Sequence, residues 1–363
     1  MGAGMSRALP QPTPALRAAA LEAGEDAVDA AQLLARRVAE RFERHVLLDA
    51  PTPLQRLDRF SEAIGAQVYI KRDDCGAFAL AGAKARKLER IVAQARARGC
   101  TTLLTAGPAQ SNTARVIATA CATAGLQADI LLRDAPGGPI EGNALIAQMT
   151  GATVTQCGEL PWPQMEARIR QRALERPDAY VVPFGGTTAG GVAGMLAGYL
   201  ELLGQLRERG VSATAIYHAS ATGGIWAGLE LGAMVTSGPR PHAVAVIHDV
   251  YPDMPQRYAG ILNDAARALS LSARVAPDQV RLDHGAIGAG YGEPTEQALQ
   301  AIGLLMRTEG ILCDYVYTGK ALAALVADAR AGRLAGPVVF WHSGGLPGIM
   351  TTSAMRILGG MQL

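Results

Sequence analysis

From Thr101 onward the sequence repeats one unit: a short run rich in β-branched residues or leucine, a glycine-bearing loop, and an amphipathic helix. Strands that alternate with helices in this way form parallel sheets covered by helices on both faces. The sequence therefore predicts an α/β protein, and 363 residues suggest about two domains. The expected strands span residues 67–71, 101–106, 129–132, 152–156, 179–183, 213–218, 242–248 and 337–341, and the expected helices span 112–124, 141–150, 162–176, 190–209, 225–235, 253–269, 293–309 and 319–331.

Lysine is scarce in this chain, because only four of the 34 basic residues are lysines and three of these lie between residues 71 and 89. Arginine cannot lose its proton in a protein, whereas lysine can act as a neutral nucleophile and form a Schiff base. Lys84 follows a loop of small residues and precedes a helix start, so we predict a chemical role for its amine. An ordinary exposed lysine at a helix start is the alternative. We expect Lys71 and Lys87 to be solvated charges.

In open α/β sheets, ligands bind where the loops after the strands converge. The loop after strand 213–218 runs into a helix through Ala221, Thr222, Gly223, Gly224 and Ile225. Backbone N–H groups of such a loop bind a phosphate without a cationic side chain. No lysine or arginine lies within ten residues of Thr222, which favours a tightly held cofactor phosphate over a phosphoryl group in transfer.

Four further loops carry polar side chains that could reach a ligand. Ser111 and Asn112 open the helix after strand 101–106, either facing a ligand or serving only as a helix cap. Ser343 follows strand 337–341 and can offer a neutral hydroxyl to a ring nitrogen, or be a turn residue. Tyr291 and Tyr317 each precede a helix, and a phenol there can relay a proton or simply pack.

The composition excludes several classes of function. The net charge is +2 without long runs of one sign, so we expect no nucleic-acid partner and no anionic membrane partner, and instead a small neutral or zwitterionic substrate. The five cysteines and the histidines show no metal-ligand spacing, so we expect no metal and mostly buried, reduced thiols. Neither a signal peptide nor a membrane-spanning run is evident, which predicts a cytoplasmic protein.

Taken in order, these motifs resemble the D-cysteine desulfhydrase and 1-aminocyclopropane-1-carboxylate deaminase family from about Ala50 to about Ile349. The resemblance rests on the lysine loop, the Ser111-Asn112 helix start, the Thr222-Gly223-Gly224 cradle, and the sequences Gly290-Tyr291-Gly292-Glu293-Pro294-Thr295, Tyr317-Thr318-Gly319-Lys320 and His342-Ser343-Gly344-Gly345. It implies pyridoxal 5′-phosphate as cofactor, the fold of the tryptophan synthase β subunit (fold type II), and a homodimer. It also implies a large domain of residues 47–87 and 196–363 and a small domain of residues 88–195. Residues 1–46 fall outside the resemblance, and their composition predicts an N-terminal helical extension in which 1–14 are disordered and 15–46, rich in Ala, Arg and Glu, form one or two amphipathic helices.

The resemblance also implies roles for the residues named above. Lys84 would form the Schiff base with the cofactor, Asn112 would bind the 3′-oxygen of its ring, and Ser111 would touch the substrate carboxylate or relay a proton. Residues 221–225 would hold the phosphate, and Ser343 would face the pyridine nitrogen. The remaining pair, Tyr291 and Tyr317, would line the substrate side.

The implied activity is α,β-elimination from a small amino acid, with D-cysteine as the default substrate. Thr318 and Ser343 stand where the deaminases carry Glu and Leu, which favours the desulfhydrase branch. The chain departs from the family at Ala83, at Gly107-Pro108-Ala109, at Thr113 and at Ile225, so the substrate does not transfer automatically. Cyclopropane ring opening, β-replacement and a non-catalytic binding protein with the same fold are the alternatives.

Overall fold

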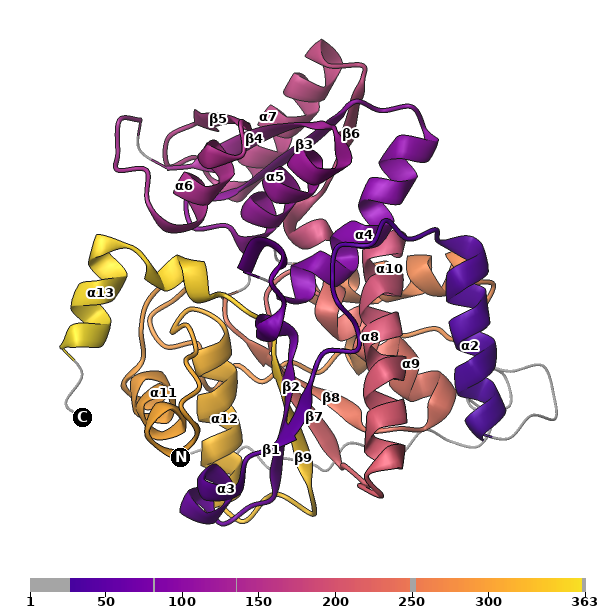
Figure 1. The fold of residues 1–363 in the computed structure, drawn as a ribbon, viewed down its shortest axis with the longest axis vertical. Coiled ribbons are helices and arrows are strands. Elements are labelled where there is room, and N and C mark those ends of the chain that lie inside the picture. Colours follow the sequence, from indigo (N-terminus) through magenta and orange to yellow (C-terminus); the bar gives the residue numbers. More distant parts are fainter. Residues whose placement is uncertain (1–26, 81, 135, 249–252, 361–363) are drawn as a thin grey trace.

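The computed structural model describes residues 27–80, 82–134, 136–248 and 253–360. The chain forms two lobes, each built on its own sheet (Figure 1). The larger sheet has the order β1-β2-β9-β7-β8, formed by β1 (Leu54–Arg56), β2 (Val68–Arg72), β9 (Val338–His342), β7 (Ala215–Ser220) and β8 (Arg240–Ala245). The smaller has the order β5-β4-β3-β6, formed by β5 (Thr153–Gln156), β4 (Gln127–Arg133), β3 (Thr102–Pro108) and β6 (Ala179–Val181).

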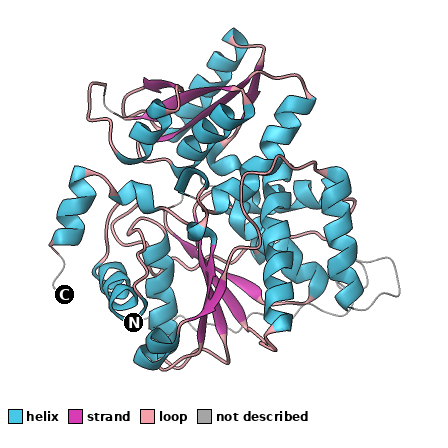
Figure 2. Cartoon of the chain, in the orientation of Figure 1, coloured by secondary structure: helices cyan, strands magenta, loops and turns pink. Residues whose placement is uncertain are grey.

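Every strand pair is parallel except β1 with β2, and helices alternate with strands along most of the chain (Figure 2). The predicted α/β class is therefore confirmed. Each expected strand is present with its ends displaced by a few residues. Strand β1 and the helices α3 (Asp58–Ile64) and α13 (Thr352–Gly359) were not expected, because each is too short to show a clear period in the sequence. The domain boundaries given above stay a prediction.

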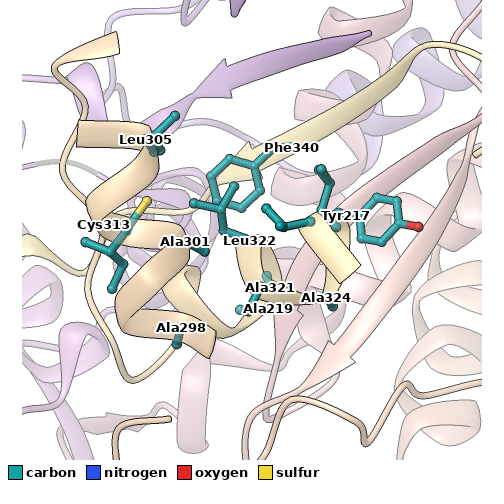
Figure 3. Packing of buried hydrophobic residues seen from close by; sticks show 14 of the residues in the cluster. Tyr217, Ala219, Ala298, Ala301, Leu305, Cys313, Ala321, Leu322, Ala324 and Phe340 are labelled. Carbon is teal, nitrogen blue, oxygen red and sulfur yellow. The ribbon is translucent and has the colours of Figure 1, made fainter. Parts of the chain in front are cut away.

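The larger sheet is buried on both faces. Along β9, Val338 and Phe340 pack with helices α11 (Glu296–Glu309) and α12 (Thr318–Arg330), in the cluster that Figure 3 shows. The alternate residues Val339 and Trp341 pack on the other side with α8 (Ala189–Glu208) and α9 (Gly224–Thr236). Because side chains alternate across a strand, burial on both faces requires the continuous apolar run of this strand.

The smaller sheet is also covered on both faces. Helices α4 (Ala83–Ala97), α5 (Asn112–Ala124) and α6 (Gly142–Met149) share one apolar cluster with Leu103 and Ile130. Helix α7 (Trp162–Glu175) covers the opposite face through Met165 and Ile169. The β3–α5 loop therefore emerges at the carboxyl edge of this sheet, where it can meet the loops of the larger one.

The described part of the N-terminal extension is one helix, α2 (Ala27–Arg41), which confirms a helix within residues 15–46. Ala30, Leu34 and Val38 follow the helical period and pack with α8, α9 and α10 (Met254–Ala268). The expectation of disorder for residues 1–14 lies outside the described residues.

Two further expectations concern the thiols and the membrane. All five cysteines are free, but only Cys121 and Cys313 are buried, so the expectation of mostly buried thiols is wrong. None of the helices in the described ranges is both long and apolar enough to span a bilayer.

Candidate active site

The loop before Lys84 is pressed against the end of β9. Gly82 adopts φ +113°, and its N–H donates to the carbonyl of Asp73 at 2.8 Å. The next N–H, of Ala83, donates to the carbonyl of Ser343 at 3.1 Å. A Cβ on Gly82 would lie 2.7 Å from that carbonyl oxygen, so only glycine fits. These contacts fix the start of α4, where Lys84 is the second residue.

A buried polar network also anchors the loop before Lys84. The Asp73 carboxylate accepts hydrogen bonds from the Arg86 guanidinium at 2.8 and 3.0 Å, from Trp341 Nε1 at 2.8 Å and from the Thr52 hydroxyl at 2.9 Å. Beside it, Asp74 forms an ion pair with Arg72 at 2.7 Å. The two adjacent aspartates therefore brace the lysine loop.

The four lysines occupy different surroundings. Lys84 is partly buried and lines a cavity, and burial lowers the pKa of its amine to about 8. A substantial fraction is therefore neutral near physiological pH, as a nucleophilic amine requires. Lys71, Lys87 and Lys320 are 0 % exposed, so the expectation of solvated charges at Lys71 and Lys87 is wrong. Lys71 is instead neutralised by the carboxylate of Glu201.

A cavity of about 410 Å³ brings the predicted site residues together. Its wall contains side chains from the carboxyl ends of both sheets, as expected for an α/β protein. The predicted site residues that line it are Lys84, Ser111, Asn112, Ala221, Thr222, Gly223, Gly224, Ile225, Tyr291, Tyr317 and Ser343. The structure thus gathers segments more than 200 residues apart in the sequence, while their individual roles stay predictions.

One end of the cavity is a cradle of backbone groups at the N-terminus of α9. Gly223 is the residue before the helix and adopts φ +79°, and a Cβ there would lie 3.0 Å from the Tyr258 ring. The turn η3 (Phe184–Gly186) closes the cradle from the other lobe, because a Cβ on Gly185 would lie 2.1 Å from Thr222 Oγ1. The geometry fits a phosphate, which needs close approach to backbone N–H groups.

Sequence reasoning missed Lys87 as part of this cradle. Its Nζ donates to the carbonyl of Gly185 at 3.0 Å and lies 2.6 Å from where a Cβ of Gly224 would be. Burial, followed by repulsion from Lys84, lowers the pKa of this amine well below its ordinary value. Lys87 has no carboxylate partner among the described residues, so an anion in the cradle would supply the missing counter-charge. The spacing Lys84-x-x-Lys87 on one helix was the available signal.

Another part of the cavity wall is built from side chains of the β3–α5 loop. Ser111 caps α5, because its Oγ accepts a hydrogen bond from the N–H of Ala114 at 3.1 Å. Both Ser111 and Asn112 also line the cavity, so the cap does not remove Ser111 from the cavity wall, and a ligand-facing role stays a prediction. The Asn112 carboxamide oxygen accepts from Arg115 at 2.8 Å.

Tyr291 and Tyr317 line the same cavity, and their hydroxyl groups share a hydrogen bond. The rings are edge to face with centroids 5.8 Å apart. Burial raises the pKa of Tyr291 to about 12 and that of Tyr317 well above its ordinary value, so both phenols are protonated at neutral pH. The backbone N–H of Tyr317 donates to Asp314 at 2.7 Å, and Lys320 Nζ donates to the carbonyl of Gly290 at 2.9 Å, which fixes both loops.

Comparisons with known proteins match this architecture. The family model described as "Pyridoxal-phosphate dependent enzyme" matches residues 46–344. Among solved structures, an "ACC deaminase homologue" is 31% identical, covers 88% of this chain and 96% of its own, and has a TM-score of 0.80. The processed form of threonine deaminase isoform 2 from Solanum lycopersicum is 15% identical over 99% of this chain and 97% of its own, with a TM-score of 0.66. A serine racemase from Dictyostelium discoideum is 16% identical over 88% and 97%, with a TM-score of 0.59.

The two-lobed fold and the family match define the class of fold type II enzymes that use pyridoxal phosphate. The chain belongs to the family of pyridoxal-phosphate-dependent enzymes. Its cofactor is pyridoxal phosphate, and the alternative of a non-catalytic binding protein is set aside.

Proposed function

We propose that this enzyme is a lyase that removes a leaving group from a small amino acid by α,β-elimination. D-cysteine is the default substrate, with a keto acid, ammonia and hydrogen sulfide, the simplest thiol leaving group, as products. The observation that carries the proposal is that a lysine amine, the Ser111-Asn112 helix start and two hydrogen-bonded phenols line one cavity.

Five features of the site would hold the cofactor. Lys84 would bind it covalently, residues 221–225 with Lys87 behind them would hold the phosphate, Asn112 would donate to the 3′-oxygen, and Ser343 would face the ring nitrogen. Bound pyridoxal phosphate supplies an electron sink for the negative charge that develops on the substrate α-carbon. A neutral serine cannot enforce a protonated ring nitrogen as a carboxylate does, which suits elimination, where that charge is consumed by loss of the neighbouring group.

The pKa shifts of Lys84 and of the two tyrosines indicate which group takes a proton and which group gives one. Lys84 Nζ, with its pKa lowered to about 8 by burial, takes the proton from the α-carbon, and the electron pair forms the Cα–Cβ double bond as the bond from Cβ to sulfur breaks. The departing sulfur needs a proton, and the pair of Tyr291 and Tyr317 supplies it because both phenols are protonated at neutral pH. Ser111 would orient the substrate carboxylate from the start of α5.

Opening of a cyclopropane amino acid is the second candidate. It is favoured by the 31% identity to the solved structure described as an ACC deaminase homologue. Thr318 and Ser343 stand against it, because those deaminases carry Glu and Leu there. β-Replacement with a second nucleophile uses the same proton transfers and is the third candidate.

The test is a substrate panel with the purified enzyme, measuring keto-acid and ammonia release from D-cysteine, L-cysteine, D-serine, L-serine and 1-aminocyclopropane-1-carboxylate. We expect D-cysteine to be turned over, and Lys84→Ala to abolish the reaction. Turnover of the cyclopropane substrate without D-cysteine would replace the leading proposal by the second. Release of the sulfur leaving group without keto acid or ammonia, together with incorporation of an added nucleophile into the amino-acid product, would favour β-replacement.

We also propose a homodimer, on the resemblance stated above, and a cytoplasmic location. Light scattering of the purified protein tests the first, because a dimer has twice the mass of the 37.8 kDa chain. Fractionation of the source cells tests the second.

A further inference from the structure

Arg115 is a buried charge one helical turn after Asn112. It is 1 % exposed, and its Nη1 donates to Asn112 Oδ1 at 2.8 Å and to Asn143 Oδ1 at 2.5 Å. Burial lowers the pKa of the guanidinium to about 10, which still leaves it charged at neutral pH. The side chain also lines the cavity. Burial of a cation is costly, which argues against a role in packing alone.

The Asn143 carboxamide connects Arg115 to Gln110 in the β3–α5 loop. Asn143 Nδ2 donates to the carbonyl of Gln110 at 3.0 Å, and the backbone N–H of Asn143 donates to Gln110 Oε1 at 2.8 Å. Gln110 Nε2 in turn donates to the carbonyl of Glu141 at 3.0 Å. Asn143, in helix α6, therefore binds the guanidinium and, through its hydrogen bonds with Gln110, also fixes the residue preceding Ser111. The position of the guanidinium does not depend on Asn112.

Arginine has only donors, so it can bind a carboxamide only through the oxygen. Because Oδ1 of Asn112 points to Arg115, Nδ2 lies at the other end of the same planar group. Within the described ranges, no residue accepts a hydrogen bond from this Nδ2, and Asn112 lines the cavity. Its amide hydrogens are thus available to an acceptor there, and the 3′-oxygen of pyridoxal phosphate is such an acceptor.

We propose that Arg115 is a positioning residue that locks the Asn112 carboxamide so that its amide hydrogens, and not its oxygen, meet the 3′-oxygen of the cofactor. The inference rests on the proposed place of Asn112 beside that oxygen. Without the arginine, rotation of the carboxamide would bring two oxygens together and remove the donor. The sequence signal is the spacing of three residues between Asn112 and Arg115 on one helix.

The experiment is a spectrophotometric pH titration of the cofactor-loaded protein. A donor on the 3′-oxygen stabilises its negative charge and lowers the proton affinity of the nitrogen that joins Lys84 to the cofactor. Asn112→Ala should therefore raise the pH at which the visible band titrates by about one to two units. Arg115→Lys keeps the positive charge but loses the planar fork, so it should raise that pH in the same direction.

The double variant separates positioning from a direct electrostatic effect. If Arg115 acts through Asn112, Arg115→Lys shifts the titration in the native background and adds nothing to Asn112→Ala. If Arg115→Lys shifts the titration equally in the native protein and in Asn112→Ala, the inference is overturned. It is also overturned if Asn112→Ala shifts the titration and Arg115→Lys does not. Either result leaves the placement of Asn112 intact. No shift from Asn112→Ala would overturn both.

Two further measurements keep the test decisive. Asn143→Ala removes one anchor of Arg115 without touching the cofactor, and should give a smaller shift that again disappears in the Asn112→Ala background. It replaces Arg115→Lys if that variant does not fold. If the visible band does not titrate in the accessible pH range, cofactor retention in dialysis is compared across the same variants. We expect Arg115→Lys to reduce retention in the native protein and to add no loss to Asn112→Ala. Additive losses would count against a positioning role.

Discussion

Two parts of the cavity wall, which we call the phosphate end and the substrate end after their proposed roles, are built from different parts of the chain. The phosphate end consists of backbone at the start of α9 and in the turn η3, with glycines at 185, 223 and 224 where side chains would collide. The substrate end consists of side chains, among them the hydroxyl pair of Tyr291 and Tyr317. Backbone groups bind phosphate whatever the side chain, whereas reaction chemistry depends on individual side chains.

This difference explains which departures from the family pattern matter. Ile225 replaces a threonine in the cradle, and its side chain packs into the core with Met195 and Leu229. A cradle of backbone N–H groups tolerates that replacement. Thr113 and Pro108 border the substrate end, where the same kind of change alters what the enzyme can accept. We therefore expect changes at the phosphate end to affect cofactor binding, and changes at the substrate end to affect turnover.

The largest effect is expected from Gly224→Asp. A carboxylate about 4 Å from a phosphate costs about 4 kcal/mol at an effective dielectric of 20. Crowding adds about 1 to 3 kcal/mol, because the new Cβ would lie 2.9 Å from Thr187 Cγ2. Cofactor affinity should fall by roughly 10⁴-fold, measured by dialysis. Gly224→Asn is the uncharged control and should lose less, and unchanged retention in Gly224→Asp would show that the phosphate lies elsewhere.

At the other end, Tyr317→Phe or Tyr291→Phe should keep the visible band of the loaded enzyme and lose turnover. Removing a general acid typically costs about 10² to 10⁴ in rate, and the loss should fall mainly on kcat. Steady-state kinetics beside absorbance on the identified substrate measures both. Full activity in both phenylalanine variants and in Ser111→Ala would contradict the assignment of this end to catalysis.

A smaller effect is expected from Lys87 at the phosphate end. It tests whether a side chain contributes there, because we propose Lys87 as a side-chain contact in a cradle otherwise made of backbone groups. Lys87→Met should weaken cofactor affinity by about 10- to 100-fold, the value of a hydrogen bond to a charged group. Lys87→Gln keeps the length without the charge and should behave like Lys87→Met. Native-like affinity in both variants would leave the backbone alone as the phosphate site.

The fold and the outline of the cavity could be predicted from the sequence because they depend on local pattern. Strand and helix periods, and glycines before helix starts, are visible within a few residues. Lys71 and Lys87 could not be placed correctly, because their burial depends on partners far away in the sequence, Glu201 for the first and Gly185 for the second. The short strand β1 was missed because it exists only through its pairing with β2.

The pairing of Tyr291 with Tyr317 illustrates the same limit at the substrate end. Each tyrosine could be singled out by its loop, but their hydrogen bond depends on how two loops 26 residues apart are anchored by Lys320 and Asp314. The link from Asn112 to Arg115 was visible as a spacing, yet its meaning depends on Asn143 on another helix. Side-chain orientation thus required the structure.

The central claim is that Lys84 carries the cofactor, although Lys87 lies one helical turn away against the same cradle. Borohydride reduction of the loaded enzyme, followed by proteolysis and mass spectrometry, fixes the cofactor on the lysine that holds it. We predict the added mass on Lys84 alone, and a colourless protein without added mass for Lys84→Ala. A label on Lys87, or a visible band retained in Lys84→Ala, would contradict the account.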